Sequence, residues 1–347
     1  MSLETAFERH ALPLEFPFGI SRGTATEAEV VTVRIEDDEG TVGVGGAGPS
    51  PHYGETPDTV AAVLPELLAV VEEVGDPHAL ERIERRMRET VNRNPSARCA
   101  VSIALHDLAA KRLGVPLYRY WGLDPDRTLE TSYTIGLDDP ETMREKTETA
   151  LERGHSRLKV KLGTDRDVEI VRTIRSAAPD VDLFVDANEA WTPREAVRKI
   201  DRLAEFDLEF VEQPVAAEDP EGLRFVYERS SLPIAADESC ITVEDVPQIA
   251  DRCDIANLKL MKCGGLLEAK RIIHTARAHG LEVMCGCMTE SNASIAAACH
   301  LAPLLDYADL DGSLLLDEDP YSGVAMPGGE IDLAGLERAG TGAVLEE

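Results

Sequence analysis

Lysine is scarce in this sequence, although charged residues are plentiful. Only eight of the 35 basic residues are lysine, and the 65 acidic residues leave a formal net charge of −30. A surface this negative repels nucleic-acid phosphates and anionic lipids, so we expect neither nucleic acid nor a membrane as a partner. Half of the lysines occur in two short clusters, which are Lys159 with Lys161 and Lys259 with Lys262.

The surplus of carboxylates favours a halophilic protein from a salt-rich cytoplasm. Unpaired carboxylates repel one another and destabilise a compact chain, and molar salt removes most of that cost by shortening the Debye length to about 3 Å. We therefore expect the unfolding temperature to rise between about 0.1 M and about 1 M KCl. An unfolding temperature that falls over this range, followed by circular dichroism, would contradict the hypothesis.

Features of membrane and secreted proteins are missing. No run approaches the about 18 apolar residues of a membrane span, and the first ten residues, which include Glu4 and Glu8, do not resemble a signal peptide. The seven cysteines are odd in number and form no Cys-x-x-Cys pair, which argues against a disulfide framework or a zinc knuckle. We therefore expect reduced thiols and a cytoplasmic location.

Residues 1–125 are predicted to form a small α+β domain. Apolar runs at 30–35 and 41–44 flank a turn with Gly40, which predicts a hairpin. Amphipathic segments at 56–74, 78–90 and 96–113 predict three helices. Two or three strands followed by three helices are typical of a compact α+β unit.

Residues 126–315 alternate between strand and helix patterns. Amphipathic segments separate eight short apolar runs at 133–135, 158–162, 183–185, 208–211, 234–236, 255–260, 281–285 and 307–310. This alternation favours a closed parallel barrel of the (β/α)8 kind, with an open doubly wound sheet as the alternative.

Ionisable residues recur with the period of one strand and one helix. Intervals of 25, 26, 25 and 25 residues separate Lys161, Asp186, Glu212, Asp237 and Lys262. Each ends or follows an apolar run, so we expect all of them at the C-terminal ends of successive strands, where a barrel carries its active site.

The three carboxylates of this series predict a metal site. Neighbouring carboxylates in a concave site cannot all stay ionised without a cation. Oxygen ligands suit Mg²⁺, with Mn²⁺ as the alternative, and the lack of histidine or cysteine at these positions argues against zinc. We therefore assign Asp186, Glu212 and Asp237 as the metal ligands.

The two lysines of the series predict proton transfer. The second and sixth strands of a closed barrel face each other, so Lys161 and Lys262 are expected on opposite sides of a substrate at the metal. Positive charge from Lys159 and from the metal favours the neutral form of each lysine. Loss of a proton next to a carboxylate creates an enediolate, which a divalent ion stabilises. Two opposed bases predict racemisation or epimerisation, whereas one active base suits a syn elimination or a cycloisomerisation.

These motifs resemble those of the enolase superfamily, in its muconate-lactonising subgroup. The matching segments are KVKLG (159–163), DAN (186–188), EQP (212–214), ADES (236–239) and KLMKCGG (259–265). The resemblance implies an α/β fold with a modified (β/α)7β TIM-like barrel over 126–315. It also implies that residues 1–125 form an α+β capping domain, which the tail 316–347 completes.

Within the superfamily the sequence is most similar to dipeptide epimerases of the Ala-Glu type. Asp309 and Asp311 place two carboxylates on one face of the last strand, where they would pair with the α-ammonium of a substrate away from the metal. The resemblance implies a dipeptide as the substrate. It also implies substrate contacts from Arg22 in a lid loop, Thr134, Lys159 and Glu290.

Other activities remain open at this point. N-acyl amino acid racemases, o-succinylbenzoate synthases and muconate-type cycloisomerases share the scaffold, but their substrates lack the free α-ammonium that Asp309 and Asp311 would bind. A Schiff-base aldolase would use one barrel lysine and no metal, and the carboxylate triad argues against it. A non-catalytic binding protein is the remaining class, and a homo-oligomer is not excluded.

Overall fold

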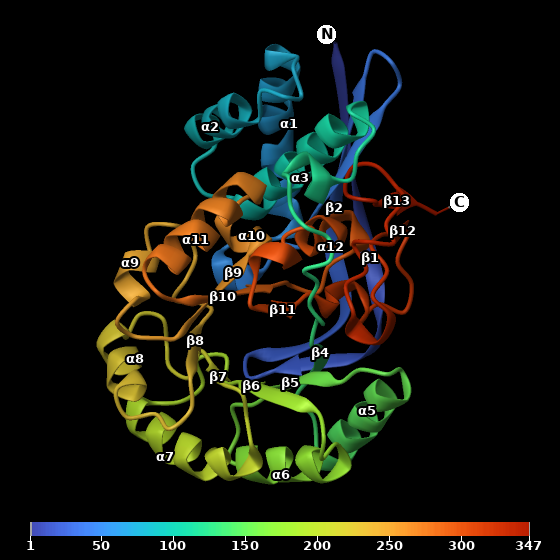
Figure 1. Ribbon diagram of the computed structural model, residues 1–347. Coiled ribbons are helices and arrows are strands. Elements are labelled where there is room, and N and C mark those ends of the chain that lie inside the picture. Colours follow the sequence, from blue (N-terminus) through green and yellow to red (C-terminus); the bar gives the residue numbers. More distant parts are fainter. Residues whose placement is uncertain (1, 347) are drawn as a thin grey trace.

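A cap and a barrel make up the computed structural model, which describes residues 2–346 (Figure 1). The strands are β1 (Leu3–Ile20), β2 (Gly23–Asp37), β3 (Val42–Ala47), β4 (Tyr133–Ile135), β5 (Arg157–Lys161), β6 (Asp182–Asp186), β7 (Val211–Glu212), β8 (Ile234–Ala236), β9 (Ile255–Lys259), β10 (Glu282–Gly286), β11 (Tyr307–Asp309), β12 (Tyr321–Ser322) and β13 (Val344–Leu345). The cap sheet has the antiparallel order β1-β2-β3, and the barrel sheet runs in parallel from β4 to β11.

Helices cover the cap sheet and surround the barrel. The α-helices are α1 (Pro57–Val74), α2 (Leu80–Thr90), α3 (Pro95–Arg112), α4 (Leu117–Tyr120), α5 (Pro140–Glu152), α6 (Asp167–Ala177), α7 (Pro193–Leu203), α8 (Pro220–Tyr227), α9 (Val246–Ile249), α10 (Leu260–Cys263), α11 (Leu266–Ala278) and α12 (Asn292–Cys299). Short 3-10 helices are η1 (Pro51–Tyr53), η2 (Ala204–Phe206), η3 (Ala302–Leu304), η4 (Asp311–Ser313) and η5 (Pro327–Gly329).

The predicted barrel is confirmed. All eight predicted strand regions contain barrel strands, and helices follow the first seven of them, which is the (β/α)7β pattern. The ring closes where Thr131, just before β4, pairs with Ala308 of β11, and Ser132 N donates to the oxygen of Ala308 at 3.0 Å. Because the strands lie side by side in chain order, the alternative of an open doubly wound sheet is excluded.

An apolar layer closes the barrel below its C-terminal end. Its buried members are Phe184, Phe210, Ala235, Ile255 and Met284. Phe184 and Phe210 stack with their ring centroids 4.3 Å apart. Residues two apart on a strand point to the same side. The residues that follow these layer members by two positions therefore also face the barrel interior. The charged site therefore rests on a packed apolar floor.

Glycines in β3 let the cap sheet approach α3 closely. A Cβ atom at Gly43 or Gly45 would lie 2.1 Å from a backbone oxygen of α3, that of Ala104 or Ala100 respectively. Only glycine avoids this clash, and the helix therefore packs directly on the strand.

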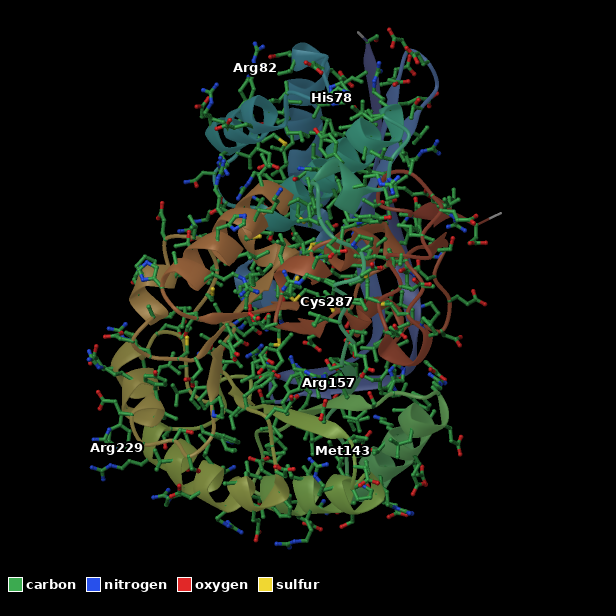
Figure 2. The ribbon with its side chains drawn as sticks, in the orientation of Figure 1. His78, Arg82, Met143, Arg157, Arg229 and Cys287 are labelled. Atoms are coloured by element: carbon green, nitrogen blue, oxygen red, sulfur yellow. The ribbon has the colours of Figure 1, made fainter. Side chains whose placement is uncertain are left out.

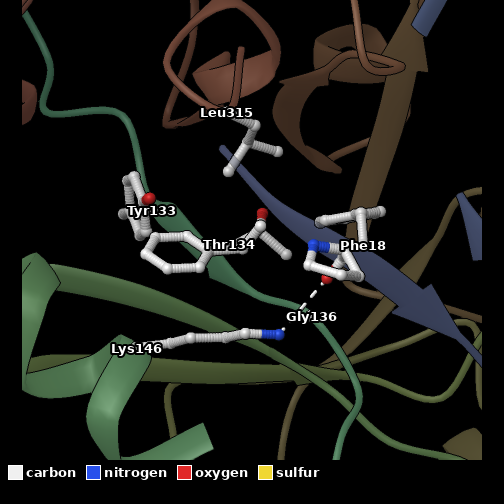
Figure 3. Close-up of a pocket in the computed structure, with 8 residues that line it drawn as sticks. Phe18, Tyr133, Thr134, Gly136, Lys146 and Leu315 are labelled. Carbon is white, nitrogen blue, oxygen red and sulfur yellow. Dashed lines mark hydrogen bonds between the residues drawn. The ribbon is translucent and has the colours of Figure 1, made fainter. Parts of the chain in front are cut away.

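The β1–β2 hairpin reaches from the cap to the mouth of the barrel (Figure 1). Near its tip, Gly19 accepts a hydrogen bond of 2.7 Å from Leu137 N, and Lys146 donates to Pro17 O at 3.2 Å beside a small cavity of about 20 Å³ (Figure 3). The C-terminal segment also contacts this hairpin, because Glu15 N donates to Leu315 O at 3.1 Å. These contacts hold the hairpin over the strand ends.

Thiols lie inside the molecule. All seven cysteines are free, six are buried, and the partly buried Cys287 lies in the middle of the molecule in Figure 2, whereas Arg229 points outward from its rim.

Among residues 2–346, no helix combines the length and the apolar composition needed to cross a bilayer.

Glu84 is a buried carboxyl at the junction of the cap helices and the barrel. It lies on α2 and accepts a hydrogen bond of 2.6 Å from Ser102 Oγ on α3, which accepts one from Leu266 N at the start of α11. Burial raises the pKa of this carboxyl from 4.5 to about 7. The folded protein therefore favours the protonated form, and stability falls as the pH rises from 4.5 toward 7.

We expect Glu84→Gln to raise the free energy of unfolding by about 3 kcal/mol near pH 8 and to leave it unchanged near pH 4.5. Glutamine keeps the oxygen that Ser102 contacts but does not ionise. Urea unfolding at both pH values measures the effect, with Glu81→Gln on the exposed face of α2 as the control. An equal change at both pH values would mean that Glu84 keeps the same protonation state on folding.

Candidate active site

A cavity of about 900 Å³ lies between the hairpin and the C-terminal ends of the barrel strands. The cap contributes part of the hairpin and the loop after β3, and the barrel residues that line it are Thr134, Lys159, Lys161, Asn188, Glu238, Lys259, Cys287, Met288, Thr289, Asp309, Asp311 and Leu315. This volume is typical of sites for small molecules.

Three carboxylates converge next to the lysines that line this cavity. Asp186 is the last residue of β6, Glu212 is the last residue of β7, and Asp237 directly follows β8. All three are at most 1% exposed, and one oxygen of each lies within 4.8 Å of the others. The ladder pairs Asp186 with Glu212, so neighbouring strand ends bring these side chains together.

The pKa values of these carboxyls differ, because the neighbouring lysines affect them to different extents. Burial opposes ionisation of Asp186, but Lys161 and Lys159 outweigh it and lower the pKa of that carboxyl to about 2. Burial raises the pKa of Glu212 to about 8, and the charge of Asp186 adds to the rise. A cation beside all three groups would hold Glu212 ionised at neutral pH.

The donor set fits magnesium. Asp186, Glu212 and Asp237 offer only carboxylate oxygens, which are hard ligands of the kind that Mg²⁺ prefers. Their oxygens lie close enough together to share one ion, and a divalent ion would hold all three groups in the ionised form. These residues would hold the ion that the sequence predicts.

Two lysines face each other across the cavity. Lys161 ends β5 and Lys259 ends β9, and these strands lie four places apart in an eight-stranded ring. Lys161 Nζ lies 2.7 Å from Asp186 Oδ2, and Lys259 Nζ lies 2.9 Å from Asp237 Oδ2. The metal-ligand strands β6, β7 and β8 occupy the arc between them, so both ammonium groups adjoin the carboxylate triad.

Lys262 lies away from the position that the 25-residue period predicts. β9 ends at Lys259, and Lys262 is the third residue of the short helix α10. Its ammonium donates to Asp237 Oδ1 at 2.6 Å, to Asn257 O at 3.0 Å and to the backbone oxygen of Asp237. The side chain is fully buried and holds Asp237 from behind, whereas Lys259 lines the cavity.

Lys159 joins the triad to the last strand. Its buried ammonium lies 2.7 Å from Glu212 Oε2, 3.2 Å from Asp186 Oδ2 and 2.8 Å from Asp309 Oδ2. The sequence placed Asp309 away from the metal, but Lys159 links it directly to two of the expected ligands. We expect Lys159 to hold these carboxylates in position.

Both carboxylates of the predicted pair line the cavity, but only Asp309 lies on the last strand, because Asp311 begins the 3-10 helix η4. Asp309 ends β11 and accepts a hydrogen bond of 2.6 Å from Ser132 Oγ, and Asp311 accepts one of 2.6 Å from Thr134 N. Burial and the charge of Asp309 raise the pKa of Asp311 to about 7. Lys159 lowers the pKa of Asp309 in spite of burial.

Glu290 does not line the cavity that the sequence assigned it to. Its carboxyl accepts hydrogen bonds of 2.8 Å from Met288 N and 2.6 Å from Ser294 Oγ, and burial raises its pKa to about 7. Met288 and Thr289 line the wall instead. Glu290 therefore stabilises the loop after β10 through these hydrogen bonds.

Arg22 lies at the tip of the hairpin, in the predicted lid. Its guanidinium donates to Glu238 Oε1 at 2.9 Å, and to Glu189 Oε2 and Asn188 O at 3.1 Å. Ser21 Oγ donates to Asn188 O at 3.2 Å. The lid is thus fastened to the loops after β6 and β8, and Arg22 contacts protein carboxylates.

Sequence reasoning missed Lys259, Glu189 and Glu238. Lys259 belongs to the buried run that predicts β9, and it ends that run as Lys161 ends β5. That parallel was a usable signal for Lys259. Glu189 and Glu238 acquire their role only from Arg22, more than 160 residues earlier, so no local pattern marks them.

Comparisons with known proteins agree with this architecture. The family model of the mandelate racemase / muconate lactonizing enzyme N-terminal domain matches residues 2–122, and that of the enolase C-terminal domain-like family matches residues 142–339. The L-Ala-D/L-Glu epimerase of Bacteroides thetaiotaomicron is 38% identical over 97% of this chain and 87% of its own length. A hydrophobic dipeptide epimerase of Enterococcus faecalis is 37% identical over 90% of both chains.

Solved structures show the same similarity. The L-Ala-D/L-Glu epimerase of Bacillus subtilis, in a complex with substrate, has a TM-score of 0.93, 34% identity and 99% coverage of both chains. The dipeptide epimerase of Enterococcus faecalis, in a complex with Mg and L-Leu-L-Tyr, has a TM-score of 0.90, 35% identity and 99% coverage of both chains. The chain therefore belongs to the enolase superfamily, as a racemase or epimerase of the mandelate racemase / muconate lactonizing enzyme family with a carboxylate triad for Mg²⁺.

Proposed function

We propose that this enzyme epimerises a dipeptide at the α-carbon of its second residue. The observation that carries the proposal is the placement of Lys161 and Lys259 on opposite walls, with the carboxylate triad between them. A base on each face takes the α-proton on one side and returns a proton on the other. The dipeptide epimerases among the relatives support this reaction.

We assign the second base to Lys259 in place of Lys262. Lys259 lines the cavity, whereas the ammonium of Lys262 is engaged by Asp237 and Asn257. A base needs free access to the carbon that it deprotonates. Lys262 acts in this proposal by positioning Asp237.

The charges of the site hold the substrate in one orientation. Bound magnesium supplies positive charge that stabilises the substrate carboxylate as the α-proton leaves. Asp309 and Asp311 bind the α-ammonium of the first residue from the opposite arc of the barrel. A substrate that lacks this ammonium, as in the N-acyl racemases, would leave Asp311 without the cation that this proposal assigns to it, since Lys159 already pairs with Asp309.

Exchange of the α-proton with solvent tests the proposal. Protein, Mg²⁺ and a dipeptide library are incubated in D₂O at high salt, and mass spectrometry and chiral separation follow each dipeptide. We expect deuterium at the second residue together with its inversion, and loss of both on removal of Mg²⁺. N-acetylated dipeptides serve as matched controls without the ammonium.

Three results would contradict the proposal. Faster exchange in the N-acetylated series would favour an N-acyl amino acid racemase. Deuterium incorporation without inversion would leave only one working base. Borohydride trapping of substrate on Lys161 or Lys259, without a need for Mg²⁺, would favour an aldolase.

A further inference from the structure

The layer of side chains directly above the apolar floor has a gap at β10. Each floor residue is followed two positions later by a residue that faces the same way. On β6 to β10 these residues are Asp186, Glu212, Asp237, Asn257 and Gly286. The first four carry polar side chains, so Gly286 is the member of this set that leaves its position in the layer open.

Gly286 lies between two functional side chains of the proposed site. Its ladder partners are Lys259 on β9 and Asp309 on β11. The backbone of Gly286 is an ordinary part of strand β10 and lies outside the left-handed region that favours glycine. What glycine provides at this position is therefore the absence of a side chain.

The aliphatic stem of Lys259 extends into the gap. A Cβ atom on Gly286 would lie 3.0 Å from Lys259 Cε, 3.0 Å from Asn257 Oδ1 and 3.1 Å from Asn257 Nδ2. These distances are shorter than the roughly 3.5 Å at which non-bonded carbon atoms pack best, so one neighbour would have to move. Lys259 thus occupies the space beside Gly286, and its side chain lines the cavity.

Of the two neighbours, Lys259 is the one that can yield. Asn257 is fully buried, and its Nδ2 donates to Glu212 Oε1 at 2.8 Å. The end of a lysine side chain is flexible by comparison. The Lys259 ammonium is held at the wall by an ion pair of 2.9 Å with Asp237 Oδ2. A side chain on Gly286 would therefore displace this ammonium from Asp237.

We infer that Gly286 is a positioning residue for the second base, because its missing side chain gives the Lys259 ammonium its place at the wall of the cavity. The inference rests on the proposed function, which assigns Lys259 as that base. Lys161 lies on β5, which does not adjoin β10. A side chain on Gly286 should therefore impair proton transfer on one face of the α-carbon and spare the other.

Gly286→Ala tests the inference with the pure L,L and L,D stereoisomers of Ala-Glu and of Leu-Tyr, in D₂O with Mg²⁺. We expect α-proton exchange to fall by about tenfold for the stereoisomer that depends on Lys259, and by less than about twofold for the other. Lys259→Ala identifies the dependent stereoisomer. The ratio of the two rates cancels any effect on Mg²⁺ binding, because the metal serves both faces, whereas a general packing defect would slow both equally.

Gly46→Ala is the matched control. Gly46 is a buried glycine of β3 at which a Cβ atom would lie 3.2 Å from Ala293 Cβ, so the substitution causes similar crowding between the cap and α12. It should leave the ratio of the two rates unchanged. Equal losses for both stereoisomers in Gly286→Ala, or an unchanged ratio, would overturn the inference.

A crystal structure of Gly286→Ala separates this inference from the proposed function. If the wild type exchanges no dipeptide at all, the proposed function fails, and the structure of the variant still reports where Lys259 lies. We expect its Nζ atom to have moved away from Asp237 Oδ2. An ion pair that keeps its wild-type length would overturn the inference.

Discussion

Replacing Lys259 with alanine is expected to slow epimerisation by about a thousandfold while sparing deuterium exchange in one of the two stereoisomers. Epimerisation needs a proton donor and a proton acceptor on opposite faces of the α-carbon. With Lys259 gone, Lys161 still removes and returns a proton on its own face. Lys161→Ala should show the mirror-image result, with exchange kept in the other stereoisomer.

Lys262 provides the comparison that separates a base from a positioning residue. Its ammonium contacts Asp237 and backbone oxygens, so Lys262→Met should weaken Mg²⁺ binding and reduce exchange of both stereoisomers equally. The readouts are exchange rates for each pure stereoisomer, together with Mg²⁺ titration. A stereoisomer-selective loss in Lys262→Met, combined with an equal loss in Lys259→Ala, would return the role of base to Lys262.

Asp186→Asn is expected to abolish Mg²⁺-dependent turnover, by roughly a thousandfold or more, because several kcal/mol of charge stabilisation are lost. The variant removes one of three converging carboxylates and the main partner of Lys161. Stability gives a second readout. Mg²⁺ at a concentration of about 100 times its Kd should raise the free energy of unfolding of the wild type by about 2.7 kcal/mol. That stabilisation should be absent in the variant.

Glu290→Gln is the matched control for Asp186→Asn. Glu290 is also buried, and its amide counterpart can keep the contacts with Met288 and Ser294. We expect its turnover and its stabilisation by Mg²⁺ to match those of the wild type. Turnover by Asp186→Asn at the wild-type rate would remove the metal from the mechanism.

Half of the lysines in this chain lie inside the barrel. Lys159, Lys161, Lys259 and Lys262 are at most 8% exposed in their side chains, and all of them contact carboxylates of the site. These ammonium groups offset the cost of burying the carboxylates that they contact. The acidic coat of the surface and the acidic site therefore serve different purposes, although composition alone counts them together.

The sequence by itself determined the barrel and the metal ligands. Short apolar runs recur with one strand–helix period, and a charged residue at the end of each run must lie at the same rim. Asp186, Glu212 and Asp237 follow from that rule, as does Lys161. These are local properties of strand length and spacing, which a single chain displays without any tertiary contact.

Only the tertiary structure favours Lys259 over Lys262 as the proposed second base. Pairing of Lys259 with Gly286 of β10 sets where β9 ends, and the turn into α10 then points Lys262 behind Asp237. The 25-residue period does not contain this information, because three residues of helix advance the chain without extending the strand. Packing likewise turned Glu290 away from the cavity.

The ion pairs of Arg22 in the lid also depend on the tertiary structure. Alone in the sequence, Arg22 reads as a free cation that would attract a carboxylate. The hairpin brings it to Glu189 and Glu238, which follow it by more than 160 residues and form ion pairs with its guanidinium. Spacing along the chain determines which residues reach the rim, but the net charge that a ligand meets depends on which distant side chains fold against each other.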